Sequence, residues 1–192
     1  DFISRIKMAQ DELGDDMLWI PIADVPEFHR GFLQFGYQNY LGALILYKDS
    51  MDRYFEYLGE LARLHNDVIA HAIIEEDLTP FVMLGSDICD NHGPMVSPKL
   101  LNEIYFPHVK KSIEPLQRKG VKTLWHCDGN VNPIFDTLLN MRIDGFQGFQ
   151  EEHGVDFPRI MNTKAKSGKP LIVLGSISVT TTLPRGTVED VE

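Results

Sequence analysis

The chain has 192 residues, about the length of one domain. Its composition, with 43% hydrophobic, 10% aromatic and 24% charged residues, is typical of globular proteins and disfavours disordered, fibrous and membrane-spanning classes. Because 28 acidic residues face 18 basic ones and the net charge is -10, we expect neither nucleic acid nor a membrane surface as a partner.

Short apolar runs alternate with longer segments of helical period, which is typical of a parallel α/β fold. Residues 2–13 already have helical spacing. Strands are then predicted at residues 17–23, 80–86, 122–127, 143–149 and 171–177. Helices are predicted between them, at residues 41–47, 51–76, 98–119, 133–141 and 158–167. In the helix at 98–119, Ser97 predicts the N-cap and Gly120 the C-cap, whereas Pro107 and Pro115 predict a bend or a split.

Five strand-helix units could build either an open doubly wound sheet or a closed (β/α)₈ TIM barrel. No glycine-rich phosphate loop follows any predicted strand, so the barrel is favoured. Thr187 and Asp190 resemble a capping pair that opens a further helix. We therefore expect residues 1–192 to form a partial barrel, the central to C-terminal part of a single barrel domain, completed by residues outside this range or by partner chains.

The two cysteines, Cys89 and Cys127, fall near the ends of predicted strands. Two cysteines are too few for a disulfide framework, so they are interpreted as reduced thiols. The first residues, Asp1, Phe2 and Ile3, show neither a basic stretch nor an apolar signal core. These features together predict a cytoplasmic protein.

The densest group of reactive side chains runs from Trp125 to Pro133. Because strand side chains alternate, His126 and Asp128 should lie on one face and Cys127 on the other. A histidine beside a carboxylate can hold a divalent metal, or act as a base with an orienting partner. The alternative is that residues 128–130 form a simple turn and that His126 is a core imidazole.

Acidic residues follow two other predicted strands. Asp87 comes after the second strand, and Glu151 and Glu152 come after the fourth. In a barrel the carboxyl ends of the strands meet at one mouth, where catalytic residues lie. Each acid alone is more often a solvated loop residue, but the three strand ends together predict a site. For His29, His92 and His108 the sequence defines no group of charged partners. His92 remains a further candidate because it lies near Asp87 in the sequence.

Several motifs that lie apart in the sequence resemble motifs of one known protein superfamily. They are Ser86-Asp87-Ile88, the segment from Gly93 to Pro98, Tyr105 to His108, His126 to Asn130, and Gly145 to Asp156. In order and spacing they resemble the uroporphyrinogen decarboxylase superfamily over residues 75–192, and within it the branch of corrinoid-linked methyltransferases. The resemblance implies a (β/α)₈ barrel whose substrate enters at the carboxyl-terminal mouth.

Zinc-dependent methyltransferases of this superfamily carry His-X-Cys-Gly, in which the histidine and the cysteine bind zinc. Here His126 matches the histidine, but Asp128 occupies the cysteine position. A hard oxygen ligand thus replaces soft sulfur, which counts against thiol activation by zinc. The resemblance implies Glu152 as a further ligand or proton acceptor, with a metal set of His126, Asp128 and Glu152.

The resulting hypothesis is an enzyme that moves a methyl group between a corrinoid protein and a small-molecule substrate. Asp87, His126, Asp128 and Glu152 are the candidate catalytic residues, while Asn130 and Glu151 are expected to bind substrate. Zinc and a partner's corrinoid are the expected cofactors, and a homo-oligomer is compatible with the sequence. The alternatives are a uroporphyrinogen-type decarboxylase (a lyase), a metal-dependent barrel hydrolase, and a non-catalytic domain that docks a corrinoid protein. Decarboxylation ranks lower because the predicted strand ends supply acids and no arginines for a polycarboxylate substrate.

Overall fold

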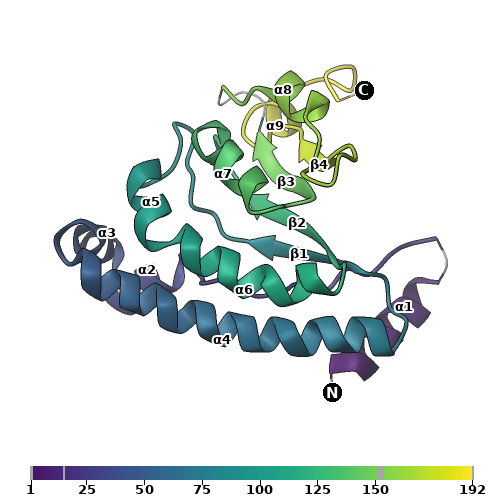
Figure 1. The fold of residues 1–192 in the computed structure, drawn as a ribbon. Coiled ribbons are helices and arrows are strands. Elements are labelled where there is room, and N and C mark those ends of the chain that lie inside the picture. Colours follow the sequence, from purple (N-terminus) through teal and green to yellow (C-terminus); the bar gives the residue numbers. More distant parts are fainter. Residues whose placement is uncertain (1, 15, 151–153, 192) are drawn as a thin grey trace.

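A parallel β-sheet forms the centre of the protein in the computed structural model, which describes residues 2–14, 16–150 and 154–191 (Figure 1). The strands are β1 (Phe81–Gly85), β2 (Lys122–Cys127), β3 (Gly145–Gln150) and β4 (Ile172–Ser176). They lie side by side in the order β1-β2-β3-β4, and every pair is parallel. The predicted α/β class is thereby confirmed, with four strands among the described residues where five were expected.

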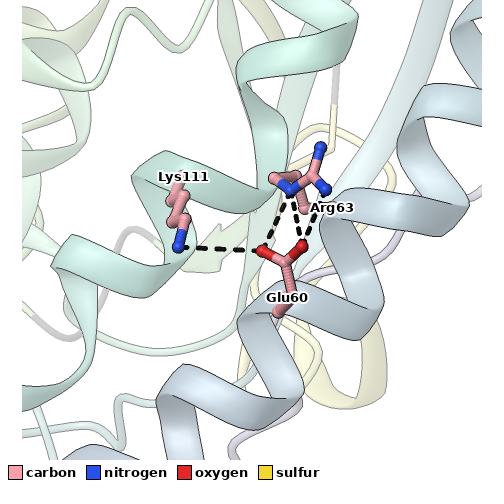
Figure 2. Close-up of polar contacts among 3 residues, drawn as sticks. All are labelled: Glu60, Arg63 and Lys111. Atoms are coloured by element: carbon pink, nitrogen blue, oxygen red, sulfur yellow. Dashed lines mark hydrogen bonds and ion pairs between the residues drawn. The ribbon is translucent and has the colours of Figure 1, made fainter.

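Helices precede and connect the strands (Figure 1). They are α1 (Phe2–Leu13), α2 (Arg30–Phe35), α3 (Tyr37–Leu46), α4 (Lys48–Glu75), α5 (Pro98–Ile104), α6 (Phe106–Arg118), α7 (Phe135–Asn140), α8 (Phe157–Asn162) and α9 (Thr182–Arg185), with a short 3₁₀ turn at Asn132–Ile134. The long helix α4 runs beside α6 on one side of the sheet. Between these two helices, Glu60 of α4 contacts Arg63 of the same helix and Lys111 of α6 (Figure 2).

The strand predicted at residues 17–23 is wrong. Only Ile22 forms an isolated parallel bridge, with Met83 of β1. The Met83 amide donates to the Pro21 carbonyl at 3.0 Å, and Ala23 donates to the Met83 carbonyl at 2.8 Å. Because Pro21 has no N–H, the segment cannot extend this ladder in both directions, and it follows the edge of β1 as an extended connection.

The helix predicted at residues 98–119 is split, as its prolines suggested. Ser97 caps α5 by accepting a hydrogen bond from the Leu100 amide at 3.2 Å. The split occurs before Pro107, which lies in the first turn of α6 where no amide donor is needed. Pro115, in contrast, stays inside α6. The N-terminal helix at residues 2–13 and the strand at 122–127 have the predicted bounds.

The last predicted helix opening is wrong within the described residues. Thr187 does donate its backbone amide to Asp190 Oδ2 at 2.8 Å, as a capping pair would. Residues 187–191 nevertheless form turns and not a helix. A side-chain acceptor three residues ahead favours a turn as well as a helix.

The two faces of the sheet are unequally covered. Val82, Leu84 and Trp125, which alternate along β1 and β2, are buried in one hydrophobic core that includes side chains of α4 and α6. On the opposite face, His126 of β2 is partly exposed and Leu174 of β4 is 46% exposed. One face of the sheet is thus sealed by helices, while the face that carries His126 remains accessible.

Candidate functional site

Three ligand-type side chains meet where β1 and β2 end. Asp87 follows β1 by two residues, His126 lies in β2, and Asp128 follows β2 directly. The parallel register pairs Gly85 with His126, which brings the two following loops side by side. One ligand atom from each of Asp87, His126 and Asp128 lies within 4.8 Å of the others. The structure therefore brings Asp87 to His126 and Asp128, which lie 39 and 41 positions later in the sequence.

His126 is held from both sides of its ring. Its Nδ1 lies 2.5 Å from Gln147 Oε1, and its Nε2 lies 3.3 Å from Asp87 Oδ1. An amide oxygen can only accept, so Nδ1 carries the proton in this contact. The second nitrogen, Nε2, is then directed to the carboxylate.

Gln147 was not among the residues predicted from sequence. It pairs with His126 in the register of β2 and β3, so both side chains lie on the same accessible face. A signal was present, because Gln147 is a polar residue within a predicted apolar strand. Recognising its partner required knowledge of which strands are neighbours.

The electrostatics of the site favour an ion pair. The hydrogen bond from His126 holds the pKa of Asp87 below its ordinary value, against the opposing effect of burial. In return, the hydrogen bond to Asp87 raises the pKa of His126 to about 9, with a further contribution from Gln147. In the metal-free protein at neutral pH, His126 is therefore an imidazolium and Asp87 a carboxylate.

The two loops of the site are clamped together by backbone contacts. The Asp128 amide donates to Asp87 Oδ1 at 2.8 Å, and the Asn130 amide donates to the Asp90 carbonyl at 2.9 Å. At Gly129, where φ is +82°, a Cβ would lie 2.4 Å from that same carbonyl oxygen. Only glycine allows the two loops to approach this closely.

His29 is a second residue that the sequence did not single out. It lies in the turn before α2, is partly buried, and packs edge-on against Phe32 with 5.3 Å between the ring centroids. Its charge also helps to lower the pKa of Asp87, which puts it within electrostatic reach of the site. The sequence does not reveal this proximity, because His29 and Asp87 lie 58 positions apart in the chain.

Of the remaining predicted site residues, the structure describes only Asn130. Glu151 and Glu152 lie outside the described residues. Asn130 uses its side-chain oxygen to accept a hydrogen bond from the Asn132 amide at 3.1 Å. This contact stabilises the turn after β2, so the structure gives Asn130 a local role.

The two cysteines are free and buried, in agreement with the prediction of reduced thiols. Strand alternation predicted that Cys127 faces away from His126 and Asp128, and in the structure Cys127 is buried while His126 and Asp128 are partly exposed. The Cys127 thiol donates to the Asp128 carbonyl at 3.2 Å. A hydrogen bond to Cys127, together with burial, raises the pKa of Cys89, so Cys89 remains a thiol at neutral pH.

Comparisons with known proteins identify no relative. No family model matches the chain, and a search of curated proteins and one of solved structures each found no match. Among the described helices, none combines the length and the apolar character needed to cross a membrane.

Proposed function

We propose that the chain is a uroporphyrinogen decarboxylase-family enzyme that transfers a methyl group between a small substrate and a corrinoid carried by a partner protein. The observation that supports this function is the position of His126 between Asp87 and Gln147. This arrangement keeps the imidazole protonated and places it at the carboxyl end of a parallel sheet, where barrel enzymes bind their substrates.

In this reaction the bond between the methyl carbon and a heteroatom breaks, and its electron pair stays on the heteroatom. His126 would donate to that heteroatom the Nε2 proton that it shares with Asp87 in the free protein, which makes the heteroatom a better leaving group. Asp87 positions the imidazole and stabilises its charge before transfer. A corrinoid, when bound, supplies the acceptor for the methyl group.

The same proposal places the four strands in a (β/α)₈ barrel. Ile172 and Leu174 of β4 are 37% and 46% exposed, and by register Leu174 lies on the face that carries His126. Among the described residues, β4 has a strand neighbour on one side only. Closure into a barrel would cover this apolar face and pair the free edge of β4.

Methyl transfer is tested with the 192-residue chain, free reduced cobalamin as acceptor, and a panel of methylated amines, ethers and thioethers. Formation of methylcobalamin is followed by its visible absorbance. His126→Ala should abolish turnover, while His71→Ala, which changes an exposed histidine of α4, should leave it unchanged. Turnover retained by His126→Ala would contradict the assignment, as would release of carbon dioxide from a porphyrinogen in place of methyl transfer.

Metal-assisted hydrolysis is the second candidate, favoured by the convergence of Asp87, His126 and Asp128 within 4.8 Å. One imidazole nitrogen and two carboxylates fit a zinc site of the catalytic type, in which three protein ligands leave one position open. A bound metal would supply Lewis acidity at these three residues. Metal analysis of the purified chain tests this site, because one equivalent of metal that is lost in Asp128→Ala would show that these residues hold it. The hydrolase is then distinguished from the methyltransferase by the lack of methylcobalamin formation.

A further inference from the structure

A basic groove lies at the opposite end of the strands from the Asp87–His126 site. It consists of two cavities of about 490 and 280 Å³, which share Gln117 and Arg142 as lining residues. The larger cavity is bounded by α6 and the end of α7, and the smaller one by the residues that lead into β2 and β3. The two cavities therefore adjoin each other at Gln117 and Arg142.

The groove has a charge opposite to that of the whole chain. Six cations line it, namely Lys110, Lys111, Arg118, Lys122, Arg142 and Lys166, whereas the acids are only Glu114 and Asp144. The chain as a whole carries a net charge of -10. One third of its 18 bases is therefore concentrated along a single groove.

Two of these cations already have acidic partners. Lys111 lies 3.7 Å from Glu60 of α4 (Figure 2), and Lys122 lies 2.8 Å from Asp144. For Lys110, Arg118, Arg142 and Lys166, the part of the chain that the structure describes provides no ion pair. All four are exposed, so their charges are available to a ligand.

The backbone of Arg142, which lines both cavities, has a left-handed conformation. Its φ is +65°, in the left-handed region that side chains other than glycine rarely adopt. The Gln117 side chain donates to the Met141 carbonyl at 2.7 Å and helps to hold this turn. This φ is that of a helix C-cap at the end of α7, because the Arg142 amide donates to the Leu139 carbonyl at 2.9 Å and the Ile143 amide to the Leu138 carbonyl at 3.4 Å. The cap fixes the Arg142 backbone at the point where this residue lines both cavities.

The shape and lining of the groove indicate the class of ligand. The cations are spread along two adjoining cavities, which suits an extended polyanion better than one compact phosphate. Moreover, α6 ends here with its carbonyl groups, whose partial negative charge disfavours a compact dianion. No aromatic side chain is among the lining residues of either cavity, so bases of a single-stranded nucleic acid would lack stacking partners.

We propose that this groove binds an acidic segment of a partner polypeptide. Carboxylates spaced along such a segment would pair with Lys110, Arg118, Arg142 and Lys166 in turn. Charge complementarity supports this partner, since an acidic peptide is repelled by most of this chain and attracted only where bases are concentrated. The groove and its partner are independent of the chemistry proposed at His126.

The test measures binding of a fluorescein-labelled poly-glutamate peptide to the 192-residue chain by fluorescence anisotropy at low ionic strength. The groove variant combines Lys110→Glu, Arg142→Glu and Lys166→Glu. Its matched control combines Arg5→Glu, Arg53→Glu and Arg185→Glu, which change the net charge equally outside the groove. We expect the groove variant to bind about tenfold or more weakly than the control, and added salt to weaken binding to the wild type.

Three results would overturn this proposal. They are no binding of poly-glutamate to the wild-type chain, equal loss of affinity in both variants, and stronger binding of inorganic polyphosphate or a single-stranded oligonucleotide than of poly-glutamate. Circular dichroism and thermal melting verify that each variant is folded. If the triple variant does not fold, Lys110→Gln with Lys166→Gln replaces it, and the same preferential loss relative to Arg53→Gln with Arg185→Gln is expected.

Discussion

The Nδ1 atom of His126 lies 2.5 Å from Oε1 of Gln147, across the boundary between β2 and β3. Because Gln147 Oε1 accepts a hydrogen bond from the Nδ1–H of His126, the imidazole ring is fixed with Nε2 directed to Asp87. A single amide on the neighbouring strand thus sets the orientation of the imidazole, while Asp87 is the main cause of its raised pKa.

Replacing the acid should change the titration of His126. In Asp87→Asn the largest cause of the raised pKa is removed, so the pKa of His126 should fall from about 9 toward its ordinary value. Titration of the His126 ring protons by NMR in metal-free buffer measures this change. Asp136→Asn, which removes an exposed acid paired with Arg159, is the control and should leave the His126 midpoint in place.

Replacing the amide should have a smaller effect in the same direction. Gln147→Leu removes one hydrogen bond to the imidazolium but leaves Asp87 as its partner. We therefore expect the pKa of His126 to fall less than in Asp87→Asn, and Gln147→Glu to raise it by adding a second carboxylate. If the pKa of His126 falls as much in Gln147→Leu as in Asp87→Asn, or more, then Gln147 and not Asp87 is the main cause of the raised pKa.

Stability should depend on pH through the same pair. The pKa of His126 is raised on folding, so protonated His126 adds to the free energy of unfolding. This stabilisation is fully present below its unfolded pKa of about 6.5 and is lost as the pH rises through about 9. The pKa of Asp87 is lowered on folding, so its contribution is lost as acid protonates it. Urea unfolding should show a larger difference between the wild type and His126→Gln at about pH 6 than at about pH 10. A difference that is independent of pH would refute this linkage.

Gly85 should tolerate no side chain. A Cβ at this position would lie 2.3 Å from the His126 carbonyl oxygen, and its φ is +126°. We expect Gly85→Ala to lower the free energy of unfolding by about 3 kcal/mol and to disturb the site, because strand β2 must move. Gly42→Ala in α3 meets nothing within 4 Å and is the matched control, expected to raise stability by about 0.5–1 kcal/mol as measured by urea unfolding.

The variant Arg142→Gly should be more stable than the variant Arg142→Ala. Glycine adopts the observed φ of +65° without steric cost, whereas alanine retains the left-handed penalty of about 1 kcal/mol. Thermal melting should therefore rank Arg142→Gly above Arg142→Ala. The opposite order would mean that the turn before β3 has another conformation in solution.

Local features of the fold were predictable where the chain's own pattern determined them. The bounds of β2 and α1 agree with the apolar alternation and the helical spacing of residues 122–127 and 2–13. The break before Pro107 follows from the missing amide of proline. Residues 17–23 were mispredicted because apolar composition alone does not reveal whether a neighbouring strand offers a full ladder, and here only the bridge at Ile22 forms.

By itself, the sequence determined the parallel α/β class, the position of His126 and Asp128 at a strand end, and the opposite facing of Cys127, since these follow from periodicities of a few residues. Only the tertiary structure decided that Asp87 and Gln147 hold the imidazole of His126, that His29 lies near Asp87, and that six bases line one groove. Those contacts join residues many positions apart through strand register and helix packing. Coulombic and hydrogen-bond energies depend on distance in space, which no local pattern contains.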